Sequence, residues 1–227
     1  MPFLDLAGRV EAVRARIDAA KVRGGHGQHV RIVAVTKTHE AGAVRAVVDA
    51  GIRDVGENRV QEALRKMPEA GGEARWHLIG HLQRNKVKSL AHFALLQSLD
   101  SARLADAVSA FGAGQGKPIP ALVQINVSGE VSKGGYAPAQ LEREAERLRT
   151  LEGLTVLGVM TIAPEGATET ELRTVFAGAR AARQTLAAAG HPVTELSMGM
   201  SGDFEIAVEE GATMVRLGTI LFGARDA

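Results

Sequence analysis

The sequence predicts an α/β fold, a single (β/α)₈ TIM barrel over residues 1–227 with an extra helix at its N-terminal end. Short apolar runs alternate with segments of helical spacing about eight times along the chain, a pattern typical of parallel strands joined by helices. A chain of 227 residues holds eight such units in one domain, at the small end of the range for this barrel. A doubly wound open sheet is the main alternative, although no Gly-x-Gly-x-x-Gly motif follows the first strand.

The helices are predicted from apolar residues that recur every three or four positions. Phe3, Leu6, Val10, Val13 and Ile17 have this spacing and predict the leading helix. Similar but shorter stripes predict the helices that follow the strands. These lie around residues 44–48 and 60–64, and over 104–111, 141–151, 172–186 and 204–208.

The strands are predicted from short runs of aliphatic and aromatic residues bounded by polar or small residues. Because these runs are apolar throughout rather than alternating, they indicate strands that are covered on both faces. The expected strands are residues 32–35, 52–55, 76–79, 93–97, 121–127, 155–160, 193–196 and 214–217.

The composition is that of an ordinary globular protein, and it excludes several classes of function. The formal net charge of +1 gives no field that would favour nucleic acid or an anionic membrane surface. No apolar run approaches the roughly 20 residues of a membrane-spanning helix. The absence of cysteine rules out disulfides, thiolate metal sites and a cysteine nucleophile. We therefore expect a cytoplasmic protein that binds neither nucleic acid nor a membrane.

Polar or small residues occur where the predicted strands end, and in this kind of barrel the carboxyl ends of the strands form the active-site face. Lys37 follows the first strand and is a candidate Schiff-base amine, because a partly desolvated amine is free to attack an aldehyde. A solvated lysine at a strand end is the alternative. The other strand-end residues are Glu57, Asn58, Gly80, His81, Ser98, Asn126, Met160, Thr161, Ser197, Met198, Arg216, Leu217 and Gly218.

A second group of strand-end residues has the chemistry of a phosphate site. Ser197 and Ser201 supply hydroxyls near the end of the seventh strand, and Gly218 and Thr219 follow the eighth. Glycines let the backbone approach an anion, and a short helix starting near Ser201 would point its amides at it. The alternative for Ser201 is a helix N-cap, with Phe204 opening the helix. An amine at one strand end and a phosphate site at others indicate an aldehyde-bearing phosphate ligand, which is the chemistry of pyridoxal phosphate.

Arg216 lies in a run that is otherwise apolar. A buried arginine needs an acceptor, which would be either a carboxylate inside the barrel or the ring nitrogen of a ligand. His77 and His81 are four residues apart, but a strand and a glycine separate them, so helical metal-ligand spacing does not apply to them. We therefore predict no metal site.

Several long motifs, in order along nearly the whole chain, are similar to those of a known family. They are VAVTKT at 33–38, GENRVQE at 56–62, WHLIGHLQRNK at 76–86, SMGMS at 197–201 and RLGTILFGAR at 216–225. The sequence resembles the YggS/PROSC family, whose members are called pyridoxal phosphate homeostasis proteins. The resemblance implies a monomeric single barrel like the N-terminal domain of fold-type III enzymes such as bacterial alanine racemase.

The resemblance also implies a role for each site residue. Lys37 would form the Schiff base with pyridoxal phosphate, and Arg216 would face the pyridine nitrogen. Ser201, Gly218 and Thr219 would hold the phosphate, with Ser197 nearby. By this resemblance the cofactor-binding residues are Lys37, Asn58, Met160, Ser197, Ser201, Arg216, Gly218 and Thr219.

Three classes of function follow from these residues. The resemblance implies a carrier that buffers pyridoxal phosphate and delivers it to apo-enzymes, with effects on amino-acid and keto-acid balance. An arginine at the ring nitrogen keeps that nitrogen unprotonated and weakens the electron sink, and 227 residues leave no room for the domain that supplies the second base in racemases. We therefore predict a carrier without catalytic residues. A small amino-acid racemase would need Tyr136 or His81 as second base, and a Schiff-base aldolase would need Glu57.

Overall fold

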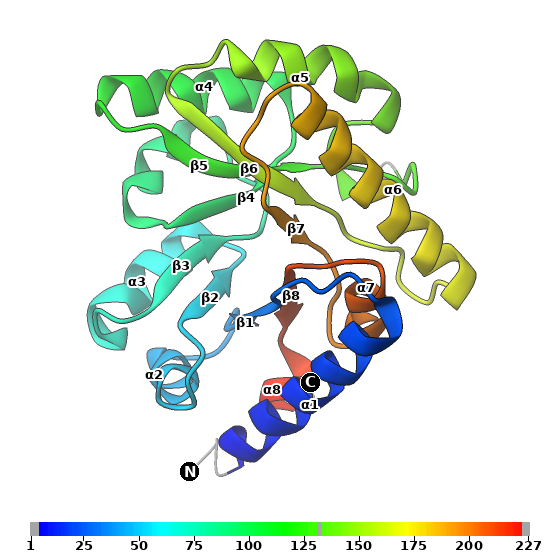
Figure 1. Ribbon diagram of the computed structural model, residues 1–227. Coiled ribbons are helices and arrows are strands. Elements are labelled where there is room, and N and C mark those ends of the chain that lie inside the picture. The colour runs from blue at the N-terminus through cyan, green and yellow to red at the C-terminus, as the bar shows by residue number, and fades with distance from the viewer. Residues whose placement is uncertain (1–4, 131–132, 224–227) are drawn as a thin grey trace.

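The computed structural model describes residues 5–130 and 133–223, which form a closed barrel of eight parallel strands. Each strand pairs in parallel with its neighbours in the sequence, and the last strand pairs with the first, so the sheet has no edge. Figure 1 shows the helices on the outside of this barrel. The predicted (β/α)₈ barrel is therefore confirmed. Phe3 of the leading stripe, and Ala224 and Arg225 of the C-terminal motif, lie outside the described residues.

Each predicted strand corresponds to one strand of the barrel, with ends shifted by up to three residues. The second strand begins at Asp54 rather than at Ile52, because the amide of the buried Ile52 bonds back to Val47 in the turn that ends the preceding helix. The strands are β1 (Arg31–Val35), β2 (Asp54–Glu57), β3 (Arg75–Leu78), β4 (Leu95–Leu99), β5 (Ile119–Gln124), β6 (Leu154–Met160), β7 (Glu195–Ser197) and β8 (Met214–Leu217).

The predicted helices fall where helical spacing places them, whereas the short helix α8 and two 3-10 segments were not predicted. The longest described helix, α6, begins with a capping box, in which Thr168 and Glu171 satisfy each other's backbone amides. No helix in the described ranges is long and apolar enough to cross a membrane. The helical elements are α1 (Leu6–Gly24), α2 (Ala41–Asp49), α3 (Val60–Ala70), η1 (Arg84–His92), α4 (Ala102–Gly114), η3 (Pro138–Gln140), α5 (Leu141–Arg149), α6 (Glu169–Ala188), α7 (Phe204–Glu209) and α8 (Thr219–Phe222).

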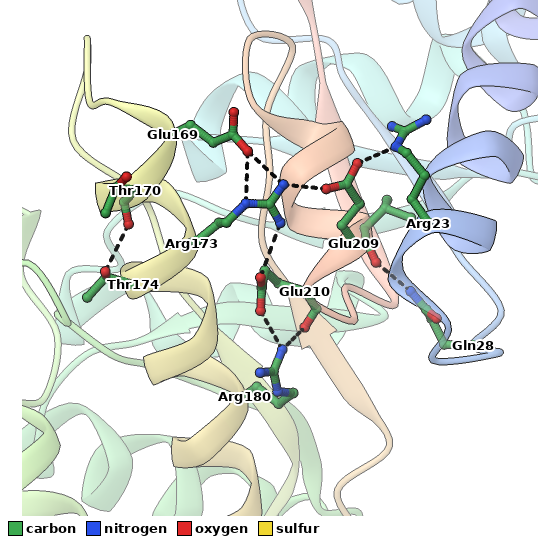
Figure 2. A network of polar contacts seen from close by, with 10 residues as sticks. Arg23, Gln28, Glu169, Thr170, Arg173, Thr174, Arg180, Glu209 and Glu210 are labelled. Carbon is green, nitrogen blue, oxygen red and sulfur yellow. Dashed lines mark hydrogen bonds and ion pairs between the residues drawn. The ribbon is translucent and has the colours of Figure 1, made fainter.

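The extra helix α1 packs against α7 and α8 at the C-terminal end of the chain (Figure 1). Its apolar face is buried, and the Arg16 guanidinium lies 4.6 Å above the centre of the Phe204 ring. Figure 2 shows an ion-pair network that joins α1, α6 and α7. In it, the Glu209 carboxylate accepts hydrogen bonds from Arg23 of α1 over 2.5 Å and from Arg173 of α6 over 2.6 Å. Glu210 extends the network to Arg180. The helix therefore covers α7 and α8 on the outside of the barrel and also contacts α2.

The barrel interior combines a small apolar cluster with polar side chains. The apolar cluster consists of Val33, Leu95, Leu122, Met160 and Met214, which project inward from five strands. Branched aliphatic layers usually fill such a barrel, whereas here several positions above and below this cluster carry polar side chains. Hydrogen bonds connect these polar side chains to the site at the carboxyl ends of the strands.

Candidate functional site

A cavity of about 870 Å³ opens at the carboxyl ends of the strands, within the size range of small-molecule sites. Its wall includes residues that follow β1, β2, β3, β7 and β8. The barrel geometry therefore brings together side chains that are far apart in the sequence. Six of the eight expected cofactor residues line this cavity: Lys37, Asn58, Ser201, Arg216, Gly218 and Thr219.

Lys37 lies two residues after Val35, the last residue of β1, and its partly buried side chain lines the cavity. On the neighbouring strands, Asn58 and Gly80 also line the wall. A Cβ atom on Gly80 would lie 2.3 Å from the Asn58 carbonyl oxygen, so only glycine lets these two strand ends approach so closely. The glycine at residue 80 therefore allows the ends of β2 and β3 to lie close together, with Asn58 at the cavity wall.

The amides at the start of α8 converge on the Ser201 hydroxyl. Ser201 Oγ accepts hydrogen bonds from the backbone amides of Gly218 and Ile220, each over 3.3 Å. The N-cap interpretation of Ser201 is wrong, because α7 begins three residues later, at Phe204, and its N-cap is Asp203. The amides that converge on this hydroxyl therefore come from the start of α8 rather than from α7. Hydroxyl and amide donors meet at one end of the cavity, as a phosphate group requires.

Arg216 lies on β8 and borders the cavity with a side chain that is almost fully buried. Its guanidinium donates to Ser197 Oγ and to the Thr161 carbonyl oxygen, each over 2.7 Å. These acceptors are neutral oxygens, not the interior carboxylate that the ion-pair interpretation required. Burial lowers the pKa of Arg216 to about 10, with the charge of Asp203 opposing it, so the group remains a cation at neutral pH.

A chain of hydrogen bonds runs through the barrel interior behind Arg216. The Ser197 hydroxyl donates to Gln97 Oε1 over 2.7 Å. The Gln97 side-chain nitrogen lies 2.8 Å from His77 Nδ1, and His77 Nε2 lies 2.9 Å from Asp54 Oδ1. The five residues come from five different strands, and all are buried. The chain therefore spans the barrel from the cavity to the opposite end of β2.

The two ends of this chain differ in hydrogen-bonding capacity, because an arginine can only donate and a carboxylate can only accept. Burial alone favours the neutral acid, but the hydrogen bond from His77 and the guanidinium groups of Arg75 and Arg31 hold the pKa of Asp54 below its ordinary value. His77 therefore donates from Nε2 to Asp54, and the Ser197 hydroxyl, which accepts from Arg216, donates to Gln97. The chain is thus a fully paired support that orients the guanidinium at the cavity.

Replacing Ser197 by alanine is expected to lower the free energy of unfolding by about 1–3 kcal/mol, the usual effect of leaving a buried polar group unpaired. The change removes the acceptor of Arg216 and the donor to Gln97. Urea denaturation measures the difference. Thr174→Ala is the matched control, since it removes an exposed hydroxyl that only bonds within its own helix and should stay within about 0.5 kcal/mol of the wild type. Equal stability of the two variants would contradict the support role.

Ser197 and Met160 are the two expected cofactor residues that are missing from the described part of the cavity wall. Ser197 is fully buried and contacts Arg216, so the structure places it behind the wall. Met160 is fully buried in the apolar cluster of the barrel interior. Any effect of these two residues on a ligand would therefore pass through the residues in front of them.

Several cavity residues were missed because the strands end later or earlier than the sequence predicts. Asp100 directly follows β4, which ends at Leu99 rather than at residue 97, and Gln124 is the last residue of β5. Lys133 and Asp203 come from loops. Small and polar loop residues carry no pattern that marks them as wall residues. The loop over residues 162–167 also lines the cavity.

The structure places the residues that the enzyme alternatives need, two candidate second bases and one candidate carboxylate, in different environments. His81 lines the cavity, with Nδ1 2.6 Å from Asp100 Oδ2 and a ring that is 70% exposed. Tyr136 is instead packed in the core between strands and helices, and its burial raises its pKa. Glu57 is fully buried and bonded to Lys66. The racemase alternative therefore keeps only His81 of its two candidates, and the aldolase alternative loses its carboxylate.

Comparison with known proteins agrees with the fold and with the motifs. Residues 9–226 match the family model of the alanine racemase N-terminal domain. The chain is 42% identical over 224 residues to the pyridoxal phosphate homeostasis protein of Pseudomonas aeruginosa, covering 97% of this chain and 96% of that protein. The protein of that name in Escherichia coli K12 is 39% identical over 233 residues, covering 98% of this chain and 97% of its own length.

A solved structure shares the same barrel. PipY of Synechococcus elongatus, with pyridoxal phosphate bound, superposes with a TM-score of 0.85 and 37% identity, covering 96% of this chain and 100% of that chain. Its structure without pyridoxal phosphate gives a TM-score of 0.87. The resemblance inferred from the sequence motifs is confirmed over nearly the full length, and the chain belongs to the family of pyridoxal phosphate homeostasis proteins.

Proposed function

We propose that this chain binds pyridoxal 5′-phosphate in the cavity as a Schiff base on Lys37, and that it holds and delivers the cofactor as part of vitamin B6 homeostasis. The observation that carries the proposal is the meeting of three complementary groups in one cavity. These are the Lys37 amine, the amides and hydroxyls around Ser201, and the Arg216 guanidinium.

The groups in the cavity fit the functional groups of the cofactor one by one. When bound, pyridoxal phosphate supplies an aldehyde that an amine can attack and a ring that acts as an electron sink. Its phosphate suits the converging amides of Gly218 and Ile220, with the hydroxyls of Ser201 and Thr219 beside them. Its pyridine nitrogen is an acceptor, which suits the cationic donor Arg216.

A carrier role is supported by what Arg216 does to the bound ring. A guanidinium donates to the ring nitrogen but does not readily give up a proton, so the nitrogen stays unprotonated and the electron sink is weak. The relatives named as homeostasis proteins and the structure of PipY with pyridoxal phosphate bound support the same role. We propose that the chain acts as a monomer in the cytoplasm, supplies apo-enzymes and thereby influences amino-acid and keto-acid balance.

The test is an absorbance spectrum of the purified protein with added pyridoxal phosphate, followed by borohydride reduction and peptide mass mapping. We expect a visible band and a pyridoxyl group fixed to Lys37. A protein that shows no band and no labelled peptide at saturating cofactor would overturn the proposal.

A small amino-acid racemase is the second candidate function, favoured by the His81–Asp100 pair. The pair leaves His81 Nε2 free at the cavity, because Nδ1 bonds to Asp100 Oδ2 over 2.6 Å. Such an oriented imidazole is a suitable general base. Incubating the loaded protein with an amino acid in deuterium oxide separates the two functions. Deuterium at the α-carbon, lost in His81→Ala, would favour the racemase, whereas an unlabelled amino acid supports the carrier.

A further inference from the structure

We propose that Lys66, Glu57 and Glu62 form a buried clamp that fixes the backbone on both sides of Lys37 and so aims its amine into the cavity. These three residues are called the Lys66 clamp below. The inference rests on the proposed function for the role of Lys37, but the clamp itself is a feature of the chain alone. It makes Lys66 a positioning residue, since it acts on the cofactor through Lys37.

Lys66 is the centre of the clamp and is 1% exposed on α3. Its ammonium group donates three hydrogen bonds: to Glu57 Oε1 over 2.7 Å, to Glu62 Oε1 over 2.7 Å and to the Thr36 carbonyl oxygen over 2.8 Å. An ammonium group has three donors, so each of them is used. The side chain is therefore held in one position and cannot reach a ligand.

The residue before Lys37 is held by this clamp through both its side chain and its backbone. Thr36 is fully buried, and its hydroxyl donates to Glu57 Oε1 over 2.6 Å. Its carbonyl oxygen is the third acceptor of Lys66. Glu57 is itself the last residue of β2, so the end of β1 is tied to the neighbouring strand and to α3 at one point.

The residue after Lys37 is held in a strained conformation. Thr38 has a φ of 70°, which makes it the one non-glycine residue with positive φ in the described ranges. This conformation is unfavourable for a β-branched residue and persists only when the surroundings enforce it. The Thr38 amide donates to Glu62 Oε1 over 2.6 Å, the same oxygen that Lys66 contacts. The clamp thus reverses the chain directly after Lys37.

Stability alone does not account for this arrangement. Removing two carboxylates and an ammonium from water opposes folding, and well-packed apolar side chains are often as stable as a buried ion pair. The carboxylate oxygen Glu57 Oε2 is also buried without a hydrogen-bond partner. Strained backbone is typical of functional positions. What the clamp provides and an apolar core would not is a defined backbone conformation at residues 36–38.

The test compares Glu62→Ala with the control Glu40→Ala. Glu62 is 18% exposed, so its removal should be tolerated, and it frees the Thr38 amide. Glu40 is nearer to Lys37 in sequence but makes only an exposed pair with Arg65 at 3.5 Å. Three quantities are measured: amide hydrogen exchange at Thr38 without ligand, the rate of covalent capture of pyridoxal phosphate by Lys37, and the affinity for pyridoxine 5′-phosphate, which lacks the aldehyde.

In Glu62→Ala we expect faster exchange at Thr38 and a capture rate lowered by about 10- to 100-fold, since a displacement near 1 Å can have that effect. The affinity for pyridoxine 5′-phosphate should stay within about twofold, because the phosphate site is untouched. Glu40→Ala should match the wild type in all three. Unchanged exchange at Thr38, or an unchanged capture rate despite faster exchange, would overturn the clamp. Failure of the wild type itself to capture the cofactor would instead overturn the proposed function. The hydrogen-exchange data alone would then test whether the clamp fixes the backbone at Thr38.

Discussion

Lys37→Ala is expected to abolish the covalent capture of pyridoxal phosphate while leaving the barrel folded. Lys37 is partly exposed at the end of β1, and its side chain lines the cavity rather than the core, so the fold does not depend on it. The proposed phosphate and ring-nitrogen contacts would remain, but the proposed covalent bond would be lost. We expect affinity to fall on the order of 100-fold, or about 2.8 kcal/mol at 1.4 kcal/mol for each tenfold change.

Difference absorbance and equilibrium dialysis measure this change, and borohydride labelling identifies the attachment. The matched control is Lys133→Ala, because Lys133 is another lysine of the cavity wall, with its Nζ 3.0 Å from the Ala163 carbonyl oxygen. This control should keep the visible band and the label on Lys37. A Lys37→Ala protein that still yields a pyridoxyl peptide, at Lys133 or elsewhere, would show that Lys37 is not the attachment point.

The barrel could be predicted because its strands occur in the sequence as separate short runs of mostly apolar residues. Runs such as residues 32–35 and 214–217 are short, and their strands are covered on both faces. The ends of the strands were harder to predict, because an apolar residue next to a strand in the sequence can be buried against a helix instead. Ile52 is such a case, since it is buried but belongs to the turn after α2.

Most of the cavity residues that were predicted lie just after a strand or in a turn rich in glycine. Asn58 and Gly218 directly follow β2 and β8, and Lys37 lies two residues after the last residue of β1. Parallel strands carry such positions to one face by geometry alone. Ser197 was assigned to the ligand because it too ends a strand. Whether a strand-end side chain faces a cavity or the interior depends on its direction on the strand, which a short apolar run does not reveal.

The burial of Lys66 could have been predicted from the sequence. It continues the buried stripe of α3, three residues after Ala63 and four before Ala70. A lysine at such a position must be paired when buried, and Glu62 lies four residues before it on the same helix. The partners on the strands, Thr36 and Glu57, are what the sequence could not supply, because they depend on how α3 packs over β1 and β2.

Lys66→Met is expected to lower the free energy of unfolding by about 3–5 kcal/mol at neutral pH, the usual effect of removing one partner of a buried ion pair. Methionine nearly fills the volume, so the loss is electrostatic. Glu57, which is fully buried, would be left with only the Thr36 hydroxyl. Because folded domains are stable by only about 5–15 kcal/mol, the change should be plain in urea denaturation.

The pH dependence identifies the group responsible. Burial already raises the pKa of Glu57 above its ordinary 4.5, and the hydrogen bonds from Lys66 and Thr36 oppose that rise. Without Lys66 the folded-state pKa should rise further. A carboxyl group whose folded pKa exceeds its unfolded value stabilises the protein below the unfolded value, and this contribution is lost as the pH rises. The deficit of Lys66→Met should therefore be smallest near pH 4.5 and grow toward neutral pH.

The double variant Lys66→Met/Glu57→Gln separates this electrostatic effect from loss of packing. It keeps the shape of the cluster but removes the charge that would be buried alone, so it should recover much of the stability at neutral pH. It should also lose most of the pH dependence of the single variant. If the single and double variants are equally destabilised at every pH, the Lys66 ammonium does not stabilise the fold by neutralising Glu57.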